Sequence, residues 1–194
     1  MANSEPYEIL TGVGSLYIAP VGESFPAVNA TPGGNWRSLG GTQDGVTVTP
    51  GQTIDEHFID QETGPVKASR SEESVMIETK LADSTLENLA DVMGNLVTTV
   101  AAGSGTIGTK AVALYRGATV ATFALLFRGV SAYGSYNAQY EVPVGYFGGD
   151  LGLEDTKDGN RAIPVEFHAL VDPNAVSDAT KFGRLVMQHQ AALP

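Results

Sequence analysis

The order of signals between residues 41 and 94 constrains the fold of this chain more than any other feature. A short alternating segment, 46–49, precedes a long polar and charged run, 50–73. A second alternating segment, 74–81, follows and leads directly into an amphipathic pattern. Alternation with a period of two predicts a half-buried strand. The sequence therefore predicts two strands joined by a long charged excursion, with a helix packed immediately after them.

The expected helix is bounded by clear signals at both ends. Ser84 and Glu87 have the spacing of a capping box, in which both side chains satisfy free amides of the first turn. Gly94 predicts a left-handed end. Apolar side chains recur at helical spacing and are expected to pack on the sheet. These helix-packing residues are Leu86, Leu89 and Met93.

The rest of the chain is dominated by short strand patterns separated by Gly, Pro and Asn. We expect a single domain, 1–194, with an N-terminal arm (1–14), a long loop (about 50–73) and a C-terminal tail (174–194). The fold class is mainly β: a β-sandwich or barrel-like pair of sheets with one flanking α-helix and a long β-hairpin loop. The further strands are expected at residues 16–20, 36–39, 111–115, 121–127, 139–147 and 162–171.

Composition limits the partners of the chain. The net charge is −11, and the eleven basic residues are scattered, which argues against binding to the outside of a nucleic acid. Cysteine is absent, so disulfides and thiolate metal sites are excluded. The longest mainly apolar run, 118–127, is too short to span a bilayer, and the N-terminus lacks a secretory signal. We expect a protein with no membrane contact.

No pattern of catalytic or ligand-binding residues stands out. His57, His168 and His189 are far apart and have no partners at metal-ligand spacing. Residues 103–108 are glycine-rich but lack the ending of a phosphate loop, and a flexible connector is the expected structure. Residues 150–160 hold several oxygen ligands without the spacing of a calcium loop. We expect no enzyme activity, no cofactor and no metal.

Alternation divides the sheet into two different faces. In segments 74–81, 139–145 and 162–171, apolar residues point one way and polar residues the other. The polar face is either an ordinary solvated surface or the wall of a wet channel built by several copies. The charged residues expected on it are Glu78, Lys80, Glu141 and Glu166.

Several motifs together resemble one family. Residues 14–20, 36–40 and 44–48 resemble the start of the major tail tube proteins of long-tailed, siphovirus-type bacteriophages. The strand-to-helix passage at 81–89 is similar to that of the same family, and 163–173 and 182–184 are similar to its ending. The likeness covers nearly the whole chain in order, although each motif alone is ordinary strand and turn chemistry.

The resemblance implies a structural protein of a virion. Its fold would be a β-sandwich subunit, which joins further copies of itself in hexameric rings. The rings would stack into a hollow tube for genome ejection, assembled in the host bacterial cytoplasm. A tape-measure protein and the tail terminator and distal tail proteins would be partners, and double-stranded DNA would pass through without specific binding.

The same resemblance gives roles to two sets of residues. Residues 50–73 would reach the next ring, and the lumen-lining glutamates would repel DNA phosphates, with Lys80 as a local neutralising charge. The lumen candidates are Glu78, Lys80, Glu141 and Glu166. The inter-ring candidates are Asp55, Glu56, Asp60, Glu62, Lys67, Arg70, Glu72 and Glu73.

Two alternatives stay open. One keeps the fold and makes the chain an inner tube subunit of a contractile tail or of a secretion system. The other is a monomeric β-sandwich module that binds a receptor or a glycan, which needs a concave aromatic site. The aromatic residues available for it are Tyr133, Tyr136, Tyr140, Tyr146 and Phe147.

Overall fold

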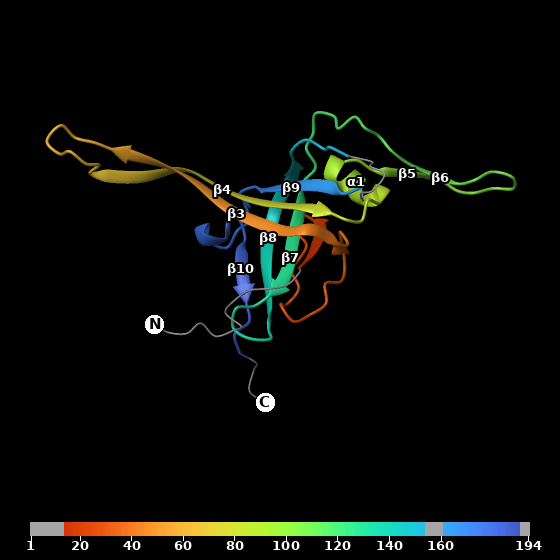
Figure 1. Ribbon diagram of the computed structural model, residues 1–194, viewed down its shortest axis with the longest axis horizontal. Helices are drawn as coiled ribbons and strands as arrows, with labels where there is room; N and C mark the ends of the chain where they lie inside the picture. The colour runs from red at the N-terminus through yellow and green to blue at the C-terminus, as the bar shows by residue number, and fades with distance from the viewer. Residues whose placement is uncertain (1–13, 154–160, 191–194) are drawn as a thin grey trace.

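The computed structural model describes residues 14–153 and 161–190, and it confirms a mainly β fold with one α-helix (Figure 1). A large antiparallel sheet forms the body, and a separate two-stranded sheet projects from it. The strands are β1 (Ser15–Pro20), β2 (Arg37–Ser38), β3 (Thr42–His57), β4 (Lys67–Leu81), β5 (Val97–Val100), β6 (Thr109–Val112), β7 (Phe123–Val130), β8 (Asn137–Gly148), β9 (Ile163–Ala169) and β10 (Arg184–Met187). The helix α1 is Leu86–Met93, and a 3₁₀ turn covers Asp178–Thr180.

Strand β8 pairs with three neighbours and so joins the two parts of the large sheet. Its strand order is β2-β1-β7-β8-β9-β4-β3, with β10 also paired to β8. The first half of β8 pairs with β7 and β10, and its second half pairs with β9. The register with β7 shifts between Phe123 and Leu125, an irregularity of the kind that bends a strand. The strands therefore form one bent sheet, whereas the sequence suggested a pair of sheets.

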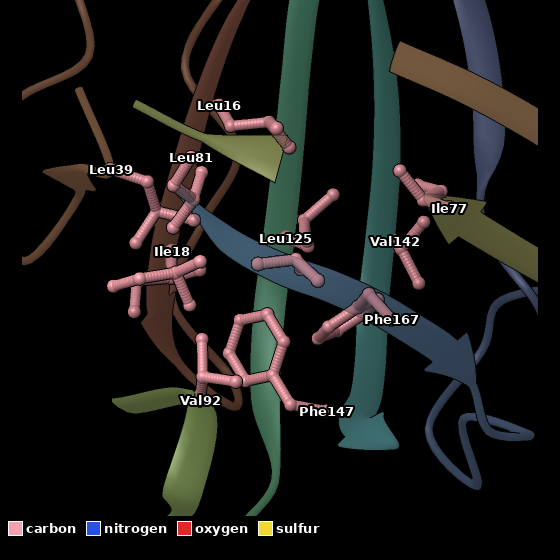
Figure 2. Packing of buried hydrophobic residues seen from close by; sticks show 12 residues of the cluster. Leu16, Ile18, Leu39, Ile77, Leu81, Val92, Leu125, Val142, Phe147 and Phe167 are labelled. Carbon is pink, nitrogen blue, oxygen red and sulfur yellow. The ribbon is translucent and has the colours of Figure 1, made fainter. Parts of the chain in front are cut away.

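The main core lies inside this bend. Leu16 of β1 and Ile77 of β4 are both about 1% exposed and belong to one hydrophobic cluster. Three strands separate β1 from β4 in the sheet order, so the two ends of the sheet fold over a common core. Figure 2 shows Leu125, Val142 and Phe167 among the side chains that converge there. Full burial of each such side chain contributes about 1.5–3 kcal/mol.

A second, smaller cluster covers part of the opposite face. Trp36, Ala124 and Leu126 are buried there, with Phe25 packed against Trp36 at 5.2 Å between ring centroids. The segment between β1 and β2 carries Phe25 and is fixed by a hydrogen bond from Trp36 Nε1 to the Ser24 carbonyl. This segment therefore shields one part of the sheet face from water.

The helix begins one residue later than its sequence signal indicates. Thr85 is the N-cap, and its hydroxyl accepts from the Asn88 amide at 3.2 Å. The capping box of Ser84 and Glu87 was therefore wrong: the Ser84 hydroxyl donates to a distant backbone carbonyl, and the Glu87 carboxylate binds Lys110. Both side chains therefore bond to residues that are remote in the sequence instead of to amides of the first helical turn. The left-handed end at Gly94 is confirmed, with φ of 70°.

The buried face of α1 is broader than the expected one. Met93 is buried, and Leu89 is half-buried and packs against the main core, whereas Leu86 is half-buried and is not among the residues of that cluster. Val92, which was not expected, also enters the main core. Asn88 is buried too, because its amide donates to the carbonyls of Leu39 and Asp83 and its oxygen accepts from Arg37.

The charged excursion, expected as a loop, is a continuation of two strands. β3 and β4 stay paired from Thr42↔Leu81 to His57↔Lys67, and only residues 58–66 form the turn. Both faces of this ribbon are exposed over most of its length, so no apolar alternation marks it in the sequence. The expected β-hairpin is present, and its polar part is a paired two-stranded arm.

The C-terminal tail is likewise part of the sheet. Arg184–Met187 forms β10 and pairs with β8 between Ala138 and Glu141. The expected N-terminal arm, 1–14, and the end of the tail, 191–194, lie outside the described residues except for Gly14.

Leu125 provides a test of the core. It is fully buried in β7, so Leu125→Ala should lower the free energy of unfolding by about 2–5 kcal/mol. The exposed Val120 provides the control, and Val120→Ala should change it by less than about 0.5 kcal/mol. Equilibrium denaturation in urea measures both, and equal effects would contradict the described packing.

Candidate interaction surfaces

The β3–β4 arm, defined here as residues 50–75, is the most prominent surface of the molecule (Figure 1). β4 pairs with β9 only from Met76 onward, so the arm is a two-stranded ribbon with no third strand. Large apolar side chains are exposed on it, including Phe58 at 62%. The others are Ile54, Ile59 and Val66. An apolar tip on a projecting ribbon is typical of a contact site.

All of the predicted inter-ring residues lie on this arm. Its six carboxylates and two basic side chains give it a net charge of −4 with His57 neutral. Arg70 binds Glu73 within the arm and donates to Gln52 at 2.9 Å. Within the described part of the chain, the other carboxylates have no ion-pair partner. These are Asp55, Glu56, Asp60, Glu62 and Glu72.

A polar face lies across β3, β4, β9 and the second half of β8. Glu78 and Glu166 are directly opposite each other in the β4–β9 register, and both are half-exposed. Like charges at opposed positions destabilise a sheet. His168 lies beside Glu166, with 3.8 Å between Nε2 and Oε2, and its ring stacks on Tyr146. The face therefore concentrates negative charge at its centre.

Lys80 lies on the same polar face but does not neutralise Glu78. Its ammonium group binds the Asp44 carboxylate at 3.0 Å. Asp44 follows Gln43, which pairs with Lys80 across β3 and β4, and the register shifts directly after it. The ion pair of Lys80 is therefore with Asp44, and none joins it to Glu78 or Glu166 within the described residues.

Glu141 was expected beside these residues, and that prediction was wrong. It lies on the same side of the sheet but is only 4% exposed. Its carboxylate accepts from Gln139 Nε2 and from Arg184 Nε, each at 2.6 Å. Gln139 also donates to the Pro26 carbonyl, so the segment after β1 closes over this region. Glu141 therefore anchors β10 and cannot line an open surface.

The Glu141–Arg184 pair generates a prediction. Arg184→Met leaves a buried carboxylate without its cation, so the free energy of unfolding should fall by about 1–3 kcal/mol. Glu141→Gln in the Arg184→Met background should recover part of this loss, because the neutral amide needs no cation. Urea denaturation of the two variants measures the difference, and an unchanged stability in Arg184→Met would contradict the anchoring role.

The β5–β6 hairpin, residues 95–116, is a second projecting surface. The strand expected at 111–115 overlaps β6, but β5 and the pairing of the two strands were not predicted from the sequence. Its two strands pair only with each other. Three of its side chains are almost fully exposed: Leu96 at 89%, Ile107 at 88% and Tyr115 at 84%. The glycine-rich stretch 103–108, expected as a flexible connector, forms its tip. The available signal was the absence of any Asp or Glu between Asp91 and Glu141.

The hairpin is tied to the helix by one ion pair. Lys110 of β6 binds Glu87 of α1 with 2.5 Å between Nζ and Oε1. This hydrogen bond is the main cause that lowers the pKa of Glu87 below its ordinary value. A lowered folded-state pKa means that the stabilisation is present above the unfolded pKa and is lost as pH falls through the folded value.

This ion pair is testable by its titration. In Lys110→Met the pKa of Glu87 should rise toward its ordinary value, because the lowering hydrogen bond is gone. The pKa of Glu87 is measured by carboxyl-carbon NMR between about pH 2 and pH 6, the range in which carboxylates titrate. Lys67→Met is the matched control on the other projecting ribbon and should leave Glu87 unchanged.

The residues considered for small-molecule chemistry are not brought together. Tyr140 stacks on Phe127, Tyr146 stacks on His168, and Phe147 is buried in the core, so they share no aromatic site. Among the described residues, no group of three His, Asp or Glu side chains is arranged to hold a metal ion. Most of the oxygen-rich stretch 150–160, namely 154–160, lies outside that part of the chain.

The sequence was compared with protein-family models and with curated proteins. No protein-family model matches the sequence, and no curated protein matches it significantly. Over residues 14–153 and 161–190, no helix has the length and apolar character needed to cross a bilayer. The function must therefore be argued from the two projecting ribbons and the polar face.

Proposed function

We propose that this chain is a structural subunit of a bacteriophage tail tube, which assembles with copies of itself into hexameric rings that stack into a hollow conduit. The motifs that resemble the siphovirus tail tube family suggest this assignment. The observation that carries it is the β3–β4 arm, a ribbon that leaves the body and has no third strand among residues 14–153 and 161–190.

The arm supports self-assembly through its unsatisfied main chain. In the described part of the chain, β3 has no partner on its outer edge over Thr42–His57, and β4 has none on its β9 side before Met76. Exposed edges are aggregation sites unless a defined neighbour covers them. Closed or stacked assemblies of identical copies provide such neighbours in a fixed geometry.

The polar face supports a conduit for DNA. Glu78 and Glu166 leave their opposed charges on an open surface, at a cost in stability that a conduit function would explain. In a lumen this surface would repel phosphates and let a duplex slide. Without Glu141, the proposed wall contains these two glutamates, and Lys80 contributes as an ion pair with Asp44. The tape-measure, terminator and distal tail proteins, and a place in the virion, belong to the same proposal.

Electron microscopy of the concentrated chain tests the proposal. We expect rings or tubes, and we expect them to disappear when residues 52–73 are replaced by Asn-Gly. That replacement closes the hairpin at the Gly51↔Ser74 pair with a favourable turn, so the body should keep its fold and its circular dichroism. A chain that stays monomeric at every concentration, or a shortened variant that assembles equally well, would contradict the proposal.

A further inference from the structure

Two ribbons of this chain have unpaired edges and exposed apolar side chains. The β3–β4 arm and the β5–β6 hairpin are both two-stranded and carry no third strand within the described residues. An isolated two-stranded hairpin is marginally stable in water. Both also expose large apolar side chains, which include Phe58 on the arm and Ile107 on the hairpin. Each ribbon therefore gains stability from a partner that buries apolar surface and covers its edges.

The charges of the two ribbons are complementary. The arm has a net charge of −4. The hairpin contains Lys110 and Arg116 and no carboxylate; Glu87 of α1 binds Lys110, so these three side chains together carry a net charge of +1. Two arms in contact would repel each other, whereas an arm on a hairpin brings acidic and basic surfaces together. Charge complementarity therefore selects an arm–hairpin contact over an arm–arm contact.

The positions of the ribbons make this contact intermolecular. The arm and the hairpin extend to opposite ends of the longest axis of the molecule (Figure 1). They cannot meet within one chain in this arrangement, but the arm of one copy can meet the hairpin of the next. Such a contact is heterologous, and it propagates into a ring or a filament.

We propose that the apolar tip of the β3–β4 arm, formed by Phe58, Ile59 and Val66, docks on the β5–β6 hairpin of a second copy of this chain. The inference rests on the proposed self-assembly and names its partner surface. The acidic side chains that flank the tip face a hairpin that has no carboxylate of its own. The exposed apolar side chains of both ribbons are buried in the same interface.

Thiol cross-linking tests the contact directly, because the chain contains no cysteine. Ile59→Cys and Ile107→Cys are prepared as separate full-length variants, mixed, and treated with a short thiol–thiol cross-linker. We expect covalent dimers in the mixture and few in either variant alone. Val176→Cys, at a fully exposed position outside both ribbons, replaces Ile107→Cys in the control mixture and should give few dimers.

A charge series distinguishes docking from random collision. Thr109 is exposed on β6, so substitutions there leave the core untouched. Adding Thr109→Glu to the Ile107→Cys partner should lower the dimer yield about fivefold, because it repels the acidic arm. Adding Thr109→Lys should not lower it. High salt should reduce the difference between the two.

The results separate this inference from the proposed function. Mixed dimers that respond to Thr109→Glu support the contact, whether or not tubes form. Tubes without mixed dimers overturn the contact and leave the proposed function standing. Mixed dimers no more abundant than in the Val176→Cys control overturn it as well, as does an equal yield from the two Thr109 variants.

Discussion

Main-chain hydrogen bonding along β4 is the constraint on which the rest of the structure depends. From Met76 to Leu81 this strand has a neighbour on each side, whereas from Lys67 to Val75 β3 is its one neighbour among the described strands. The first stretch is part of the core, and the second leaves it. The same strand therefore belongs to both the domain and the arm.

The two faces of the bent sheet have different coverings. One face encloses the main core, with α1 adding Val92. The other is divided, because the segment between β1 and β2 covers Leu126 and the region of Glu141 but leaves Glu78 and Glu166 open. Buried and exposed glutamates on one face therefore have different roles: Glu141 anchors β10, and the opposed pair gives the open surface its charge.

Local periodicity in the sequence predicted the strands of the body and the position of the helix. Alternating residues identified the strands of the body, and Gly94 identified the end of the helix. The strand pairing of the arm was not predicted, because a ribbon exposed on both faces has no apolar alternation. The pairing of the β5–β6 hairpin was not predicted for the same reason. Glu141 was misplaced because its cover comes from residue 26, which is remote in sequence. The shift from Ser84 to Thr85 at the N-cap likewise depends on a distant partner, the backbone of Arg161.

In the proposed assembly both ribbons are completed by another copy of the chain. Amide hydrogen exchange, followed by mass spectrometry in dilute and in concentrated protein, measures whether they are. We expect slow exchange in β7 and β8 at both concentrations. We expect fast exchange in residues 50–75 and 95–116 when dilute, and a slowing of both with the same concentration dependence. An arm that slows while the hairpin stays fast, or ribbons already protected in the dilute chain, would contradict the proposed assembly.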